Sequence, residues 1–304
     1  MSILNSDYDK CIDLSERVAW RVDDVIPPES RLDFSKPFMP SAMDFSRTLP
    51  FLSSTEKLQL NQIFGNSYSY LFYFVEAYII EMVMQHTQAQ LYGNDTALRC
   101  LLRFAEEEVK HQQLFLRFGE MFSAQFGSAC DLVDSPQAVA SFILGKSPMA
   151  VVLVTLHLEI ITQTHYVDSM REVKDLEPLF VSLFRHHWLE EAQHAKLDAL
   201  ELVKLRRDAS EAMVQQAITD YFAIAEAFAG LLASQAKLDV SSLERAVQRT
   251  FNEEERAAIE AAERRAYHRA FLYDGVTNPQ FLEFLGEHFP GALEGVKAAA
   301  QAFA

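Results

Sequence analysis

Two Glu-x-x-His motifs contain residue types that could bind a metal ion. One runs from Glu108 to His111 and the other from Glu191 to His194. In a helix, side chains three positions apart lie on one face, so each motif presents a carboxylate and an imidazole to the same ion. A single motif of this kind is common in helical proteins, and the residues around the two motifs make the pair informative.

Each motif follows a glutamate that lies in an apolar segment. Glu76 stands in YLFYFVEAYII, 32 residues before Glu108, and Glu159 stands in VLVTLHLEIIT, 32 residues before Glu191, so the halves repeat with an offset of 83. An unpaired carboxylate in an apolar core costs many kcal/mol, so both glutamates need a cation. One Glu from each of two helices and one Glu-x-x-His from each of two others predict the dinuclear site of ferritin-like bundles.

Carboxylate oxygens combined with imidazoles suit iron or manganese. Cys11, Cys100 and Cys130 lie away from these positions in the sequence, which argues against a thiolate zinc or iron–sulfur site. We expect two iron ions, because iron suits redox chemistry, and leave open manganese in place of one iron.

A second pair of acidic residues repeats at the same offset. Glu107 and Glu190 lie four positions before His111 and His194. We prefer Glu108 and Glu191 as ligands because they match the spacing of three, and expect Glu107 and Glu190 to be outer hydrogen-bond acceptors or surface acids.

The two halves differ at His187. This residue lies four positions before Glu191 and seven before His194, on the same helix face, whereas Phe104 stands at the equivalent place in the first half. The spacing predicts one additional histidine ligand.

Long helices must position these residues. Gly and Pro together make up 20 of the 304 residues, and no proline occurs between Pro50 and Pro136. Ser53 and Glu56 have the spacing of a capping box, which predicts a helix start. Gly93-Asn94 and Gly127 mark helix ends. Later helices are predicted to start at Ser135-Pro136, Ser147-Pro148 and Pro178. The predicted helices cover residues 53–93 with a possible defect near Gly65, 94–126, an interrupted stretch over 136–174, and 178–207.

These elements predict an all-α fold, a ferritin-like long four-helix bundle over residues 53–208. Residues 1–52, which contain five of the ten prolines, are expected to form an irregular arm that packs on this core. Residues 209–304 are expected to add three or four further helices to the same domain.

The complete pattern resembles the ferritin-like diiron N-oxygenases, the family of p-aminobenzoate N-oxygenase. The matching positions are Glu76, Glu107 with Glu108 and His111, Glu159, and His187 with Glu191 and His194. The resemblance covers residues 53–208, and it departs from the family where EEVKH replaces the frequent DEXXH. It implies that Glu76, Glu108, His111, Glu159, His187, Glu191 and His194 are the metal ligands.

The resemblance also implies a reaction. Two iron ions would use dioxygen, with electrons from a reductase or other external donor, to oxidise a small-molecule amine to a hydroxylamine, oxime, nitroso or nitro product, as in secondary metabolism. The amine could be free or carrier-bound. We expect its pocket between facing helices, near Tyr70, Phe72, Tyr73, Phe74 and Phe104.

Three other functions stay open. A diiron hydroxylase or desaturase acting on carbon would use the same ligands without needing His187. An iron-handling ferroxidase would turn over iron, and a degenerate bundle acting as an interaction module would bind no metal.

Composition limits the partners. The chain has 27 basic and 43 acidic residues, a net charge of −16 and no basic stripe, so nucleic-acid binding is electrostatically opposed.

An odd number of cysteines without CxxC spacing, and an N-terminus without a signal-peptide pattern, lead us to expect a cytoplasmic protein. The apolar windows 68–84 and 149–161 are interrupted by glutamates or too short to span a bilayer, so no membrane association is expected. A homodimer is plausible.

Overall fold

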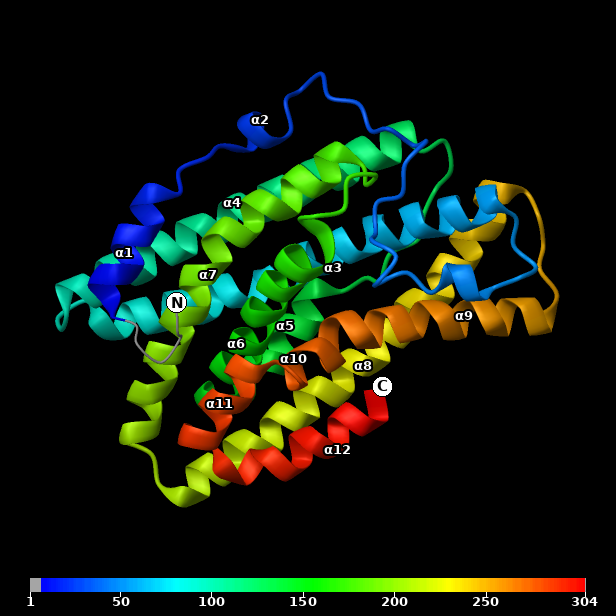
Figure 1. Cartoon of the computed structure of the whole chain (residues 1–304). Coiled ribbons are helices and arrows are strands. Elements are labelled where there is room, and N and C mark those ends of the chain that lie inside the picture. The colour runs from blue at the N-terminus through cyan, green and yellow to red at the C-terminus, as the bar shows by residue number, and fades with distance from the viewer. Residues whose placement is uncertain (1–6, 304) are drawn as a thin grey trace.

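A computed structural model describes residues 7–303, and within this range every regular element is helical (Figure 1). Four long helices form the central bundle. They are α3 (Ser54–Gln90), α4 (Asp95–Gln125), α6 (Pro148–Thr164) and α7 (Pro178–Arg207). The all-α fold with a four-helix bundle is therefore as predicted.

The bundle consists of two helical hairpins. Helix α3 packs along α4, and α6 packs along α7. Residues 76 and 108 lie on the first hairpin, and residues 159 and 191 lie on the second. The repeat offset of 83 residues thus corresponds to two hairpins that meet in the middle of the bundle.

The predicted helix starts are present, with differences in how they are capped. Ser53 Oγ accepts from Glu56 N (3.3 Å) and Glu56 Oε2 accepts from Ser53 N (2.7 Å), which completes the capping box. The third helix is interrupted as expected, because α5 (Pro136–Leu144) precedes α6. The serines before these prolines make no side-chain cap, so proline at the first helical position marks both starts.

The expected defect at Gly65 is absent, because α3 is continuous through this residue. A Cβ atom at Gly65 would lie 2.7 Å from the Cβ atom of Phe38 in the N-terminal segment. Glycine is therefore needed here for close packing between two segments, and it causes no break in the helix.

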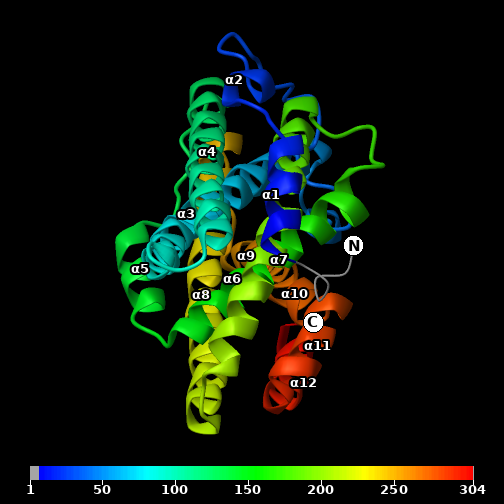
Figure 2. The same ribbon diagram turned by 90° about the vertical axis from the view of Figure 1, so that its left-hand side faces the viewer.

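The N-terminal arm contains α1 (Tyr8–Arg17), α2 (Val22–Val25) and a short 3-10 turn, η2 (Ser46–Thr48). Helices α1 and α2 lie against α4 and α7, on the upper side of the bundle in Figures 1 and 2. Asn61 of α3 fixes the later part of the arm, because its Oδ1 atom accepts from the backbone nitrogens of Phe38 and Met39.

The last two helices of the chain lie at the lower end of the view in Figure 2, away from α1 and α2. Helix α8 (Glu211–Val247) packs against α3 and α6, and α9 (Glu253–His268) packs against α8. Breaks at Asn278-Pro279 and at Pro290 divide the chain into more helices than the three or four expected. They are α8 (Glu211–Val247), α9 (Glu253–His268), α10 (Asp274–Val276), α11 (Pro279–His288) and α12 (Leu293–Phe303), with a π-helical segment η4 (Arg269–Tyr273) and a 3-10 turn η5 (Pro290–Ala292).

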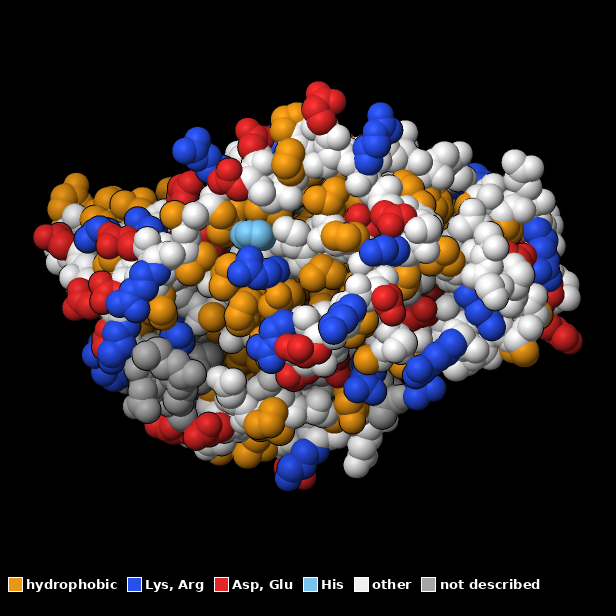
Figure 3. Space-filling model, turned by 45° about the horizontal axis from the view of Figure 1, so that its top comes forward, with side chains coloured by type: hydrophobic (Ala, Val, Ile, Leu, Met, Phe, Trp, Pro, Cys, Tyr) orange, Lys and Arg blue, Asp and Glu red, His pale blue; other side chains and the backbone are white. Residues whose placement is uncertain are grey.

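Two helical stretches are long and apolar enough to cross a membrane by length and composition alone. The stretch Pro148–Met170, formed by α6 and the π-helical segment η3 (His165–Met170), is 83% buried in its most apolar window, as a core helix is. The corresponding window of Glu211–Val247 is 33% buried. On the face seen in Figure 3, acidic and basic side chains are interspersed and do not gather into regions of one sign.

Candidate metal centre

Six of the seven predicted ligands form two overlapping groups in the middle of the bundle. Glu76, His111, His187 and Glu191 make one group, and Glu108, His111, Glu191 and His194 make the other; in each, the potential ligand atoms lie within 4.8 Å of one another. Every side chain in both groups is buried. Residues from α3, α4 and α7 thus converge on one place, as two metal ions that share ligands would require.

The inner nitrogens of the two motif histidines face the carboxylates. His111 Nδ1 lies 3.0 Å from Glu191 Oε1 and 3.6 Å from Glu108 Oε1. His194 Nδ1 lies 2.8 Å from Glu108 Oε1 and 3.3 Å from Glu191 Oε2. Glu108 and Glu191 therefore both lie between the two imidazoles.

The outer nitrogens of the same histidines donate to the second pair of acidic residues. His111 Nε2 donates to Glu190 Oε2 (2.8 Å), and His194 Nε2 donates to Glu107 Oε2 (2.9 Å). A proton held on Nε2 leaves the lone pair of Nδ1 free for a metal ion. Glu107 and Glu190 thus accept hydrogen bonds from the outer nitrogens of the two histidines. The spacing in the sequence favours this role over that of metal ligands.

His187, predicted as an additional ligand, lies next to the carboxylates of Glu76 and Glu191. Its Nε2 atom lies 2.7 Å from Glu191 Oε1 and 3.0 Å from Glu76 Oε1. The rings of Phe72 and Phe115 pack edge-on against it, with centroids 5.4 and 4.9 Å away. Both rings are apolar. The polar neighbours of the imidazole are therefore the carboxylates of Glu76 and Glu191, which lie next to Nε2.

Glu159 lies beside the centre but is not a member of either group. It lines a gap of about 10 Å³ together with Glu76, His187 and Glu191. Its side chain is buried, and its Oε2 atom has no hydrogen-bond partner within residues 7–303. Glu159 is thus next to three of the other predicted ligands without joining either group.

Several of these buried polar atoms lack hydrogen bonds within the described residues. They are Glu76 Oε2, both carboxylate oxygens of Glu108, His111 Nδ1, Glu159 Oε2 and His187 Nδ1. Such atoms cost free energy in a dry core unless a cation satisfies them. Four carboxylates and three imidazoles, with unused donor atoms pointing inward, therefore fit a pair of iron or manganese ions.

The charges of these groups depend strongly on one another. Burial would lower the pKa of His111 and His194, but the carboxylates, Glu191 first, outweigh it and raise both well above the ordinary value. Burial would raise the pKa of Glu191, yet His194 and His111 lower it to about 2. Burial and the nearby Glu108 raise the pKa of Glu76. Bound metal ions would take the place of the protons that these groups share.

His187 differs from the other two histidines. Burial, together with the neighbouring His111 and His194, lowers its pKa well below the ordinary value. It is therefore a neutral imidazole, the form that binds metal ions.

The N-terminal arm covers the histidines from outside, which the sequence did not reveal. Ser15 of α1 donates through Oγ to Glu107 Oε1 (2.6 Å). The ring of Trp20 stacks on His111 with a centroid distance of 5.9 Å and an interplanar angle of 11°. Lys110 Nζ lies 4.1 Å from the Trp20 ring centroid and 2.5 Å from Glu190 Oε1. No motif marks these contacts, because they join segments far apart in the chain.

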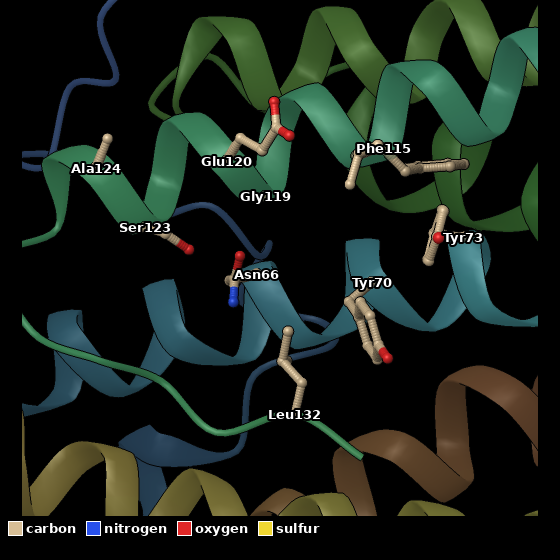
Figure 4. Close-up of a pocket in the computed structure, with 10 residues that line it drawn as sticks. Asn66, Tyr70, Tyr73, Phe115, Gly119, Glu120, Ser123, Ala124 and Leu132 are labelled. Carbon is tan, nitrogen blue, oxygen red and sulfur yellow. The ribbon is translucent and has the colours of Figure 1, made fainter. Parts of the chain in front are cut away.

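A separate cavity of about 610 Å³ lies between α3 and α4 (Figure 4). Tyr70 and Tyr73 line it, as expected of a pocket near the ligand positions, whereas Phe72, Phe74 and Phe104 are buried in the core. Phe115 also lines the cavity, although its position in the sequence gave no indication of this.

No protein-family model and no curated protein matches the chain. Among solved structures, the chain is similar to variants of an R2-like ligand-binding oxidase. One, with an anaerobically reconstituted Mn/Fe cofactor, is 13% identical with a TM-score of 0.47, over 88% of this chain and 93% of that chain. Another, with an aerobically reconstituted Mn/Fe cofactor, is 15% identical with a TM-score of 0.45, over the same shares of the two chains. Likenesses of this extent assign neither a cofactor nor a reaction to this chain.

Proposed function

We propose that this protein is a dimetal oxygenase that uses dioxygen to oxidise the nitrogen of an amine. The observation that carries this proposal is the set of inward-facing donor atoms in the bundle. His111 and His194 present Nδ1 to the shared carboxylates Glu108 and Glu191, and several of the buried donor atoms have no other partner in residues 7–303.

The seven predicted ligands would hold two metal ions. Glu107 and Glu190 would orient the two motif histidines and keep their protons on Nε2, which raises the basicity of Nδ1. His187 would add a neutral donor next to Glu76. The apolar rings of Phe72 and Phe115 would exclude water from that side of the centre.

The overall reaction is balanced by an external reductant. A primary amine, dioxygen, two electrons and two protons give a hydroxylamine and water, because one oxygen atom forms an N–O bond and the other leaves as water. When bound, two iron ions, or one manganese and one iron, would supply the redox chemistry by which electrons from the reductant reach dioxygen. The protein's own residues would hold the ions and bind the amine.

Two features favour an amine oxygenase over the other candidate functions. A largely apolar cavity next to the centre suits an organic molecule better than the transport of iron required of a ferroxidase. His187 faces the centre. The N-oxygenases that the sequence resembles have a histidine at the matching position, whereas carbon hydroxylases and desaturases do not need one.

The metal site is tested first, by measuring the metal content and thermal unfolding of protein loaded anaerobically with ferrous iron. We expect two iron ions per chain. At a concentration 100 times the dissociation constant, a bound ion adds about 2.7 kcal/mol of stability, or roughly 4 °C in Tm for a chain of this size. Glu108→Gln should lose iron. Glu106→Gln, which changes an exposed acid on the same helix, should keep it.

The reaction is tested by exposing the loaded protein to dioxygen with a panel of amines and a chemical reductant, and analysing the products by mass spectrometry. An increase of one oxygen atom on the amine nitrogen is expected. Oxygen on carbon would identify a hydroxylase, and ferric iron formed without any organic product would identify a ferroxidase. Failure to bind iron would exclude all three.

A further inference from the structure

The cavity between α3 and α4 has the size of a small-molecule site. Its volume of about 610 Å³ lies within the range of roughly 300–1,000 Å³ that is usual for ligand pockets. In Figure 4, Phe115 of α4 and Tyr73 of α3 lie at one end, and Ser123 and Asn66 lie at the other.

One end of the cavity borders the metal centre. Phe115 lines the cavity, and its ring centroid lies 4.9 Å from that of His187. Tyr73, at the same end, precedes Glu76 by three residues on α3. The Phe115 ring therefore lies between a molecule in the cavity and the centre.

The far wall of the cavity is held in place by hydrogen bonds. Leu132, in the loop after α4, lines the cavity, and the next residue, Val133, accepts through its carbonyl from Tyr70 OH (2.9 Å). Val133 N also donates to Gln235 Oε1 of α8 (2.8 Å). These bonds tie the loop to two helices, so the cavity is already formed before a ligand binds.

The chemistry of the lining selects one class of ligand. Three aromatic rings, those of Tyr70, Tyr73 and Phe115, offer faces and edges against which another ring packs favourably. Within the described part of the chain, no Lys, Arg or His lines the cavity, and Glu120 adds an acidic group at its exposed rim. A carboxylate or phosphate held against these rings would lose hydration without gaining a cation.

We propose that this cavity binds the substrate and selects amines attached to an uncharged aromatic body, while it rejects amines that carry an acidic group. This inference rests on the proposed function only for the statement that the ligand is an amine substrate. The location of the site and its preference for an uncharged ring follow from the lining residues.

Gly119 provides the means to test the location. A Cβ atom built at Gly119 meets no atom within 4 Å, and Gly119 lines the cavity, so a leucine there should take up part of its volume. Gly230, in the middle of α8 and away from the cavity, has the same open surroundings. Gly119→Leu and Gly230→Leu both replace a helical glycine, so they form a matched pair that differs in whether the cavity is filled.

The experiment measures binding of 4-chloroaniline and of 4-aminobenzoate to the purified protein by calorimetry at pH 7.5 without dioxygen, so that no turnover occurs. We expect 4-chloroaniline to bind at least tenfold more tightly than 4-aminobenzoate. Gly119→Leu should weaken 4-chloroaniline binding at least tenfold, and Gly230→Leu should leave it unchanged. Equal or tighter binding of 4-aminobenzoate would overturn the charge preference, and unchanged binding in Gly119→Leu would overturn the location.

A second pair of variants tests the acidic rim. Glu120→Lys should increase the affinity for 4-aminobenzoate about threefold, because the charge at the rim changes sign. Glu226→Lys makes the same change in net charge at an exposed position on α8 and should have no effect. Equal effects of the two variants would show that the rim does not select charge.

Failure of this inference is distinguishable from failure of the proposed function. If 4-chloroaniline binds with the expected pattern but is not oxygenated by the iron-loaded protein with dioxygen and reductant, the reaction is wrong and the binding site stands. If amines are oxygenated while Gly119→Leu binds and turns over 4-chloroaniline normally, the reaction stands and the site is elsewhere.

Discussion

The outer nitrogen of His194 on α7 lies 2.9 Å from Glu107 Oε2 on α4. The reciprocal contact joins His111 of α4 to Glu190 of α7 at 2.8 Å. Each helix therefore orients the candidate ligand of the other. This exchange couples the two hairpins at the level of the centre, so that loss of one outer carboxylate affects a histidine on the opposite helix.

Glu107→Ala should weaken metal binding without unfolding the chain. The variant removes the acceptor of His194 Nε2–H, and loss of such outer partners typically lowers metal affinity about 10- to 100-fold. Competition with a chelator of known affinity measures the change, and Glu106→Ala on the exposed side of the same helix is the control. Equal affinities for the two variants would show that Glu107 does not orient a ligand.

His187→Ala should separate metal binding from reaction with dioxygen. The six other predicted ligands remain, so two iron ions should still bind at saturating iron. The rate of oxidation by dioxygen, followed by absorbance after rapid mixing, should change about tenfold or more, because one iron loses a neutral donor. His186→Ala is the matched control, since His186 Nδ1 donates to the carbonyl of Ser182, away from the centre. Unchanged kinetics in His187→Ala would exclude His187 from the reaction.

Gly65→Ala should destabilise the fold, although alanine is the better helix former. The added Cβ atom would lie 2.7 Å from Phe38 Cβ, so the arm or the helix must shift, at a cost of about 1–3 kcal/mol. Gly230→Ala, with open space around the added atom, should instead stabilise by about 0.5–1 kcal/mol. Urea unfolding measures both, and effects of the same sign would contradict the packing role of Gly65.

Asp239 should give the stability of the fold a dependence on pH. This residue is fully buried, and it accepts hydrogen bonds from Ser67, Gln235 and Tyr267. Burial raises its pKa from 3.8 to about 7, so between these values the folded chain keeps the proton that the unfolded chain releases. The free energy of unfolding should therefore fall as pH rises through this interval, by at most about 1.4 kcal/mol per pH unit.

Asp239→Asn removes this proton and should flatten the decline. Urea unfolding of both proteins at several pH values between 4.5 and 8 measures the two slopes. If the slopes are identical, Asp239 is ionised in the folded chain and its burial must be satisfied in another way.

The amino-acid sequence by itself determined the helices and the faces on which the candidate ligands lie. Apolar periodicity, the capping box at Ser53 and the prolines at helix starts are local signals, because a helix is defined by contacts within a few residues. The spacing of three between Glu108 and His111 acts over the same short range. For this reason the bundle and the convergence of six of the seven candidate ligands could be predicted from the order of the residues alone.

Only the tertiary structure decided which atoms of these residues face inward and what surrounds them. Three arrangements depend on how the segments pack against one another. They are the hydrogen bond between His194 and Glu107, the stacking of Trp20 on His111, and the position of Phe115 between the cavity and the centre. The role of Gly65, which local pattern alone suggests as a helix defect, depends on Phe38 in the same way. These contacts join residues distant in the chain, and close packing of side chains, which no local pattern encodes, determines them.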